Sequence, residues 1–161
     1  MLKTMKNAYK QKREQGFTII EVLIVLAIAA LILLIVFLAV PALQRNSRNT
    51  SIRSDAASIL AGVNDFVANN QGQLPTTVTC TNGTVSVTGA AGSSPSEAKV
   101  RGGTACNSTG TMPGAGTTGT VSIALGSKCN GNAFLASPRA IAAGFRVENT
   151  GSTDIPQCIE S

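Results

Sequence analysis

Residues 12–40 read KREQGFTIIEVLIVLAIAALILLIVFLAV, and this stretch decides the fold. The 24 residues from Phe17 to Val40 are apolar except for Thr18 and Glu21. As an α-helix that rises about 1.5 Å per residue, a segment of this length spans roughly 36 Å. That is enough to cross a hydrocarbon core about 30 Å thick. The pattern therefore predicts a membrane helix.

The segment ahead of this helix, residues 1–16, is short, polar and basic. It holds +4 of the chain's net charge of +5, which leaves +1 from Phe17 onward. The overall charge therefore does not predict nucleic-acid binding. Basic residues precede the apolar segment and none lie within it, which predicts that the N-terminus faces the cytoplasm. These basic residues are Lys3, Lys6, Lys10, Lys12 and Arg13.

A second helical pattern follows the apolar segment. From Ala42 to about Asn70 the apolar residues recur at steps of three and four, which predicts an amphipathic continuation of the same helix. Pro41 removes one backbone hydrogen bond, and we expect it to bend the helix rather than end it. Gly72 and Pro75 predict where the helix stops. The apolar positions are Ile52, Ala56, Ile59, Leu60, Val63, Phe66 and Val67.

Beyond residue 74 apolar and polar residues alternate, as they do in half-buried strands. Asn82-Gly83 is the strongest short hairpin signal in the chain, and a two-residue turn there fixes the register of the two flanking strands. The pairs predicted on one face of that hairpin are Cys80 with Val85 and Val78 with Val87.

Further strands are predicted at 121–125, 141–147 and 155–160, again from alternation. Residues 89–119 are rich in Gly, Ser, Thr and Ala and predict a long exposed loop. The small apolar face of the sheet needs a partner, and the apolar stripe of the second helical segment supplies one. Two charged residues of the sheet, Arg146 and Glu148, are expected to face water.

The stretch from Lys12 to Leu26 resembles the type IV pilin family. That family has a short basic leader that ends in Gly, followed by Phe-Thr-x-x-Glu at the start of a hydrophobic helix. Here those residues are Gly16, Phe17, Thr18 and Glu21. The resemblance covers about the first 55 residues, and beyond them only the layout matches. It implies an α+β fold, the pilin lollipop, in which a long N-terminal helix packs against a small antiparallel β-sheet head.

The resemblance also implies a division of the chain into four parts. Residues 1–16 are a leader that is removed, and 17–40 are the hydrophobic segment for membrane and filament core. Residues 41–72 are the amphipathic continuation of the helix. Residues 73–161 are a disulfide-bonded antiparallel β head that carries the loop 89–119.

Processing at Gly16 follows from the same resemblance. A prepilin peptidase would cut between Gly16 and Phe17 and methylate the new amine of Phe17. An ordinary signal peptide is cut after its hydrophobic core, whereas this cut keeps the core. Glycine has no side chain and extends easily into a protease site. The alternative is that Gly16 is a linker residue before a helix.

Glu21 is the most informative single residue. A carboxylate in an apolar membrane helix costs several kcal/mol unless it is neutralised or paired. Glu21 lies one helical turn after Phe17, whose amine would be positive after the cut. The pair could form within one subunit, but the resemblance favours a neighbouring subunit, where it sets the assembly register. The alternative is that Glu21 lies near the membrane interface and reaches water.

The four cysteines all lie in the second half of the chain. An even number behind an export signal favours disulfides, and four cysteines allow three connectivities. The resemblance implies Cys129 with Cys158, which would leave Cys80 with Cys106 to hold the glycine-rich loop on the hairpin. The alternative is four reduced thiols. The chain has no His and no C-x-x-C, so its sequence implies neither a metal site nor a cofactor.

Three arginines follow closely after the apolar segment, namely Arg45, Arg48 and Arg53. We expect them to form a solvated face. Pairing with Asp55 or Asp65, and contact with lipid headgroups or nucleic acid, are the alternatives.

The function implied by the resemblance is that of a structural subunit of a surface filament. Its partners would be copies of itself, the prepilin peptidase, an assembly platform in the inner membrane, and membrane lipid before assembly. The chain would first cross the cytoplasmic membrane once and then join an extracellular pilus. The family's duties are adhesion, twitching motility and DNA uptake, although no pattern in this sequence supports nucleic acid as a partner.

Three other function classes are alternatives to this one. The first is a minor pilin or a secretion pseudopilin, whose heads commonly carry an acidic calcium loop that this sequence does not show. The second is a membrane-anchored extracytoplasmic binding domain that never polymerises. An enzyme is the class least indicated, because the chain lacks His and shows no paired-carboxylate pattern.

Overall fold

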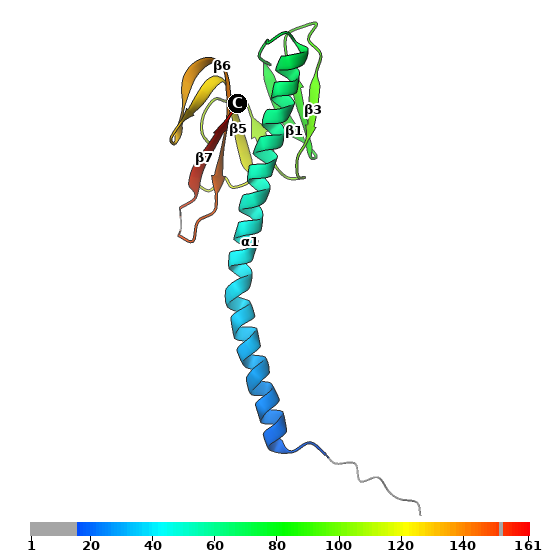
Figure 1. The fold of residues 1–161 in the computed structure, drawn as a ribbon, viewed down its shortest axis with the longest axis vertical. Helices are drawn as coiled ribbons and strands as arrows, with labels where there is room; N and C mark the ends of the chain where they lie inside the picture. The colour runs from blue at the N-terminus through cyan, green and yellow to red at the C-terminus, as the bar shows by residue number, and fades with distance from the viewer. Residues whose placement is uncertain (1–15, 152) are drawn as a thin grey trace, which may run out of the picture. The chain divides into compact units, whose positions relative to one another are not determined.

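A computed structural model describes residues 16–151 and 153–161, so all of the predicted leader except Gly16 lies outside the described part. The chain divides into two compact units. The first unit is Met1–Val40 and the second unit is Pro41–Ser161. In chain order the described elements are α1 (Ile19–Asn69), β1 (Thr77–Thr81), β2 (Thr84–Thr88), β3 (Ser96–Lys99), β4 (Ala105–Asn107), β5 (Thr120–Asn130), β6 (Ala133–Val147) and β7 (Ile155–Glu160) (Figure 1). The fold is α+β, as predicted.

Helix α1 begins at Ile19 and continues through Pro41 to Asn69. Pro41 therefore does not end the helix, which confirms that part of the prediction. Every residue from Gly16 to Gln44 is exposed. The helix contains a stretch that is long and apolar enough to cross a membrane.

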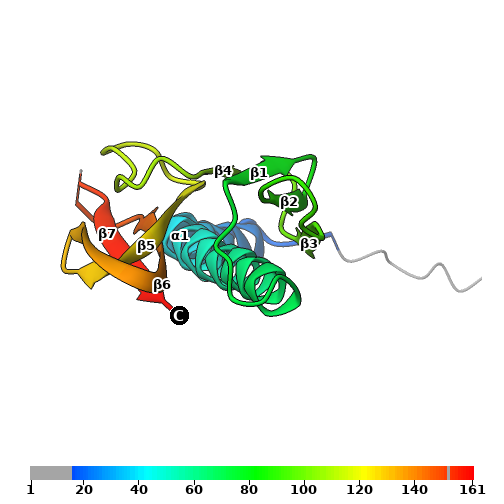
Figure 2. The same ribbon diagram turned by 90° about the horizontal axis from the view of Figure 1, so that it is seen from above.

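The strands of the second unit form two sheets, where the sequence predicted one. The first is antiparallel with the order β1-β2-β3, and the second has the order β4-β5-β6-β7. Strand β4 runs parallel to β5, and the other neighbours in the second sheet are antiparallel. Figure 2 shows the two sheets on either side of the second half of α1, with β1 and β4 next to each other.

The predicted loop 89–119 is wrong in part, because β3 and β4 lie within it. Both strands are short and lack an alternating row of large apolar residues, so no period-two signal marks them. Strand β3 pairs with β2, and β4 pairs with the start of β5. Neighbouring strands therefore order this segment where local composition could not.

The predicted hairpin is confirmed together with its register. Cys80 pairs with Val85 and Val78 with Val87, across a turn at Asn82 and Gly83. Both turn residues have a positive φ, 49° and 78°. This is the conformation that two-residue hairpin turns favour, and Asn-Gly adopts it at low cost.

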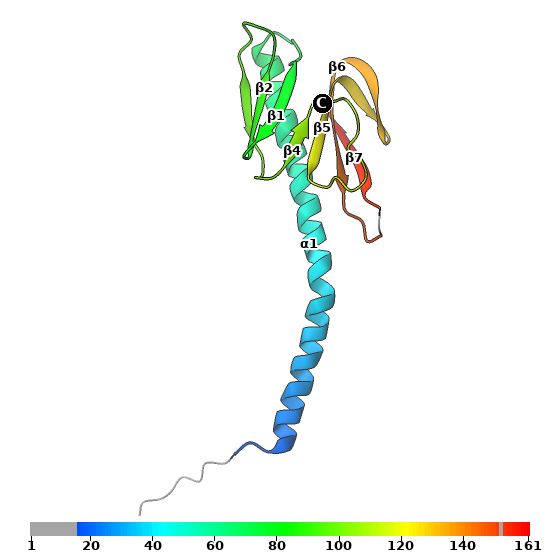
Figure 3. The same ribbon diagram turned by 180° about the vertical axis from the view of Figure 1, so that it is seen from behind.

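One apolar stripe of α1 supplies the core of both sheets. Ile52, Ala56, Ile59, Val63 and Phe66 are buried, as the three- and four-residue spacing predicted. They form a single cluster with apolar residues from each sheet. Figure 3 shows the two sheets on opposite sides of the second half of α1 from behind. The sheet residues of this cluster are Val78, Val85 and Val87 from the first sheet and Val121, Ile123, Ile141, Ala143, Phe145 and Val147 from the second.

The expectation that Arg146 and Glu148 simply face water is wrong. Both are half-buried, and Arg146 holds two loops through backbone oxygens. Its Nε donates to the carbonyl of Pro113 at 2.7 Å and its Nη1 to that of Asp154 at 2.9 Å. Alternation correctly put these side chains off the apolar face, but it could not show that loop carbonyls bind Arg146 or that side chains of α1 bind Glu148.

The close approach of α1 to β3 generates a test at Gly62. A Cβ built at Gly62 would lie 2.8 Å from the Cβ of Ala98. Helix propensity alone favours alanine over glycine by about 1 kcal/mol, whereas overpacking costs roughly 1–3 kcal/mol. We therefore expect Gly62→Ala to destabilise the second unit in urea unfolding of the full chain followed by circular dichroism.

Ala98→Gly provides the matched background, because it removes the atom that the new methyl group would meet. In that background Gly62→Ala should be neutral or stabilising. An equal loss of stability in both backgrounds would show that the contact with Ala98 is not the cause.

Candidate functional site

The start of α1 is closed by a reciprocal pair of side chains. The carboxylate Oε2 of Glu21 accepts the backbone N–H of Thr18 and the Thr18 hydroxyl, each at 2.8 Å. The Thr18 hydroxyl in turn accepts the backbone N–H of Glu21 at 3.3 Å. This is a capping box, in which two otherwise unpaired donors at a helix N-terminus are satisfied.

Thr18 was not predicted from the sequence to be a partner of Glu21. The signal was present, because Thr-x-x-Glu ahead of an apolar run is the pattern of a capping box. In the uncut chain the hydrogen bonds from Thr18 offset part of the free-energy cost of placing the Glu21 carboxylate in an apolar segment. The Oε1 atom of Glu21 has no hydrogen-bond partner among the described residues.

Phe17 and Glu21 are brought together on one side of the helix start. Both line a shallow hollow along with Val22 and Val25. Phe17 is 88 % exposed, so residues 18–151 and 153–161 offer it no packing partner. A new amine at Phe17 would arise about one helical turn from the Glu21 carboxylate.

Gly16 is a glycine that the described chain itself does not require. A Cβ built there meets no described atom within 4 Å, and its φ does not lie in the left-handed region. Neither space nor backbone conformation in this structure therefore demands glycine at residue 16. Recognition of this segment by another protein remains as a reason for glycine at residue 16.

The four cysteines form two disulfides, and these are the pairs that the resemblance implies. Cys80 bonds to Cys106 with a Cα–Cα distance of 5.3 Å, and Cys129 bonds to Cys158 with a distance of 5.8 Å. The first links β1 to β4, and so joins the two sheets where no ladder of hydrogen bonds does. The second links the end of β5 to β7.

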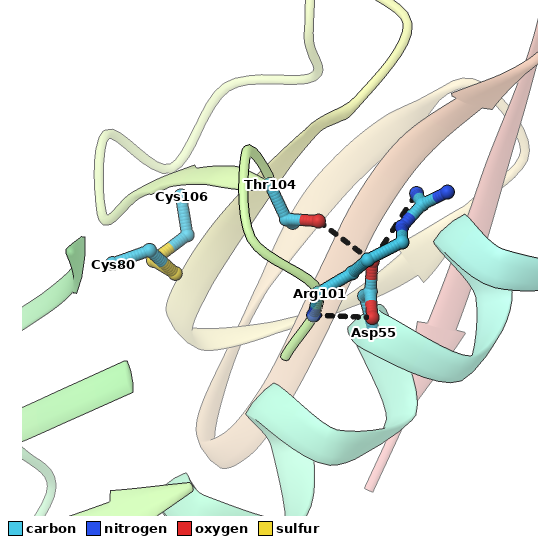
Figure 4. Close-up of a disulfide and its surroundings, with 5 residues drawn as sticks. All are labelled: Asp55, Cys80, Arg101, Thr104 and Cys106. Atoms are coloured by element: carbon cyan, nitrogen blue, oxygen red, sulfur yellow. Dashed lines mark hydrogen bonds and ion pairs between the residues drawn. A yellow bond between two sulfur atoms is a disulfide. The ribbon is translucent and has the colours of Figure 1, made fainter. Parts of the chain in front are cut away.

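A buried carboxylate next to the first disulfide holds the turn that leads into β4 (Figure 4). Asp55 of α1 is 7 % exposed. It accepts the Thr104 hydroxyl at 2.6 Å, the backbone N–H of Arg101 at 3.1 Å and the Arg101 Nη2 at 3.4 Å. Because every one of these contacts comes from residues 101–104, Asp55 fixes the turn that precedes Cys106.

Of the three arginines after the apolar segment, Arg48 and Arg53 are exposed, as the predicted solvated face requires, and Arg45 is half-buried. Arg48 binds Glu148 rather than Asp55 or Asp65, through Nε and Nη2 at 2.6 and 2.7 Å. Asn49 binds the backbone of the same residue, since it donates to the Glu148 carbonyl and accepts its N–H. The end of β6 is thus attached to α1. The hydrogen bonds from Arg48 lower the pKa of Glu148 and raise the pKa of Arg48.

Metal-ligating side chains do not gather in the part of the chain that the structure describes, where no group of three or more Cys, Asp or Glu could hold a metal ion.

Comparison with known proteins bears on the amino-terminal segment alone. Residues 11–37 match the family model of the prokaryotic N-terminal methylation motif. The match includes Gly16, Phe17, Thr18 and Glu21. Comparison with curated proteins found no match, and comparison with solved structures found none either.

The Arg48–Glu148 pair predicts a dependence of stability on pH. The folded pKa of Glu148 lies below its ordinary value of 4.5. The pair therefore contributes stability above about pH 4.5, and this contribution is lost as the pH falls through the folded pKa. We expect a modest fall in the urea midpoint of the second unit over this range, because the pair lies at the surface.

Glu148→Gln should lower stability near neutral pH and flatten its fall below pH 4.5. Glu97→Gln, at an exposed position of β3, is the matched control and should leave the pH profile unchanged. A Glu148→Gln profile parallel to that of the parent would refute the role of this pair.

Proposed function

We propose that this chain is a type IV pilin-like prepilin and the structural subunit of a surface pilus. Its N-terminal methylation motif is the class III signal peptide typical of type IV pilins. A prepilin peptidase cuts after Gly16 and methylates the amine of Phe17. The remaining chain then polymerises through the apolar part of α1, and the second unit faces outward.

The observation that carries this proposal is a carboxylate at the first turn of α1, at the start of an apolar stretch, residues 19–40, in which every side chain is exposed. From Phe17 to Val40 no side chain of the helix is buried in the chain. Such a surface needs lipid or other apolar helices around it. A membrane anchor alone would need no carboxylate there, and the carboxylate costs several kcal/mol when it is unpaired.

Cleavage gives Glu21 a partner that the uncut chain lacks. The new amine of Phe17 is a cation, and Glu21 lies one turn further along the helix. In a bundle of identical helices each carboxylate can pair with the amine of a neighbour. A neighbour shifted along the helix axis leaves both charges unpaired in an apolar setting, so the pair selects one register.

Assembly then exchanges lipid for neighbouring helices around the same apolar surface. Because both surroundings are apolar, little hydrophobic free energy changes in this step. We infer that the subunit waits in the cytoplasmic membrane with its N-terminus inside, and that an inner-membrane platform with its motor extracts it. The motor and the platform are inferred from the family.

Four cysteines in a sequence that shows no acidic calcium loop favour a pilus subunit over a secretion pseudopilin in this proposal. Of the two disulfides, one joins the two sheets and the other lies within the second sheet, and both suit a unit exposed to an oxidising exterior. Adhesion, twitching motility and DNA uptake are the duties that the family offers such a filament.

Processing is tested by mass spectrometry of the N-terminal peptide from the native, membrane- or filament-derived protein. We expect a peptide that begins at Phe17 and carries one methyl group on its amine. Gly16→Leu should abolish this product, because a large side chain next to the scissile bond does not fit where glycine does.

Gly151→Leu is the matched control. It also lies in open space without a left-handed φ, and it should leave processing intact. A native chain that still begins at Met1 in cells with an active prepilin peptidase would contradict the proposal. Normal processing of Gly16→Leu would contradict the part assigned to Gly16.

The charge and the helix cap at Glu21 are separated by a second set of variants. Glutamine also closes a capping box, so Glu21→Gln keeps the cap and removes the charge. Thr18→Val removes the cap, at a cost of about 1 kcal/mol, and keeps the charge. We expect Glu21→Gln to reduce sheared surface filaments at least tenfold, and Thr18→Val to reduce them far less.

Membrane levels of both variants, measured on the same cells, show whether the subunit is made and inserted. Filament yields that follow the cap rather than the charge would assign Glu21 to the helix start alone. They would remove the pairing between subunits from the proposal.

A further inference from the structure

A small cavity in the second unit is lined by three arginines from three separate segments. Arg48 comes from α1, Arg101 from the turn before β4, and Arg146 from β6. The cavity measures about 90 Å³, well above the roughly 10–15 Å³ that one water molecule needs on the same measure. This is room for one small oxyanion. The remaining lining residues are Asn49, Ile52, Thr118, Gly119 and Glu148.

The three guanidinium groups are held in place and still have donors to offer. Arg48 is fixed by Glu148, Arg101 by Asp55, and Arg146 by two backbone carbonyls. Each leaves one terminal nitrogen without a partner among the described residues. A ligand that binds these nitrogens has little side-chain entropy left to remove. The free nitrogens are Nη1 of Arg48, Nη1 of Arg101 and Nη2 of Arg146.

The charge of the lining favours an anion. Arg48 pairs with Glu148 and Arg101 pairs with Asp55, whereas Arg146 binds only backbone carbonyls, so these five side chains carry one net positive charge. The side chains of Arg48 and Arg101 are 52 % and 46 % exposed, so a ligand can reach them from solvent. Arginine is the side chain whose planar fork best matches phosphate oxygens.

The lining also includes a backbone turn at Thr118 and Gly119. Thr120 N–H donates to the carbonyl of Thr117 at 3.4 Å, which closes a turn around Thr118 and Gly119. Gly119 has a φ of 93°, as the third residue of a type II turn does. The closing bond uses neither central N–H group. Backbone N–H groups in such turns commonly line anion sites.

We propose that this cavity binds the phosphate of an anionic membrane lipid. The phosphate would rest against Arg48, Arg101 and Arg146 and the turn at Thr118–Gly119. A lipid presents one phosphate, which suits one cavity of this size. Nucleic acid presents a row of phosphates, and proteins that bind it usually track the row with several basic contacts.

The lipid as the source of the phosphate rests on the proposed function, while the site itself does not. Arg48 follows the last residue of the apolar segment, Val40, by eight positions, so it belongs to the part of the chain next to that segment. If residues 17–40 cross a membrane, headgroups are the nearest concentrated supply of phosphate.

The test is native mass spectrometry of the full chain in detergent, titrated separately with phosphatidylglycerol and with phosphatidylcholine. We expect phosphatidylglycerol to bind at least tenfold more tightly. Arg101→Gln should weaken that binding about tenfold, as expected for the loss of a hydrogen bond between charged groups. Its fold should persist, because Asp55 keeps its bonds to the Arg101 N–H and to Thr104.

Two further variants keep the test sharp. Arg53→Gln also removes one positive charge, from an exposed residue of α1 that does not line the cavity. It should change binding less than twofold. Thr118→Pro removes one backbone donor at a turn position that proline favours, and should weaken binding severalfold.

Equal weakening by Arg101→Gln and Arg53→Gln would reduce the effect to general surface charge and overturn the site. Equal binding of the two lipids would overturn the anionic headgroup. Inorganic phosphate or a short oligonucleotide that binds through Arg101, while phosphatidylglycerol does not, would assign the cavity to that ligand instead.

The N-terminal peptide from the same preparation separates the two proposals. A chain that begins at Phe17 without Arg101-dependent binding would refute the lipid site alone. A chain that begins at Met1, in protein purified from cells with an active prepilin peptidase, and that shows Arg101-dependent binding of phosphatidylglycerol would refute the filament function alone.

Discussion

The second unit depends on one apolar stripe of α1, which both sheets must share. The first sheet has strands of only four or five residues, and so small a sheet is not stable in water without a partner surface. Ile59, Val63 and Phe66 supply that surface and are almost completely buried. Because a helix offers a narrow stripe, the strands divide into two sheets on either side of it instead of forming one flat layer. Gly62 lets β3 come close enough to complete this packing.

Two sheets on one helix leave edges and loops that the core does not hold, and polar side chains of α1 hold them. Asn49 binds the end of β6, Asp55 binds the turn before β4, and Asn70 binds the backbone of Ser94. The disulfide between Cys80 and Cys106 joins the sheets between β1 and β4. The same turn before β4 carries Arg101 to the arginine-lined cavity. One arrangement therefore serves both the stability of this unit and its candidate ligand site.

The part of α1 in the first unit has the opposite character, because its apolar residues are all exposed. The charged group in this part is the Glu21 carboxylate at the first turn, which accepts two hydrogen bonds from Thr18 in the uncut chain. Removal of the leader would add a cationic amine at Phe17, close to the Glu21 carboxylate that Thr18 already binds. In the proposed function this is the step that changes what Glu21 can bind. The processing site and the register device are then a single local structure.

The sequence by itself determined everything that rests on local spacing. The apolar segment and its capping pattern, the continuation of α1 through Pro41, the buried stripe, and the hairpin register at Asn82-Gly83 all depend on residues a few positions apart. The tertiary structure alone decided the division into two sheets, the parallel pairing of β4, and the bonds of Arg48 to Glu148 and of Asp55 to Arg101. Those features join residues about 15 to 100 positions apart. Periodicity reports which face of an element is apolar, but it does not report which distant loop will cover the other face.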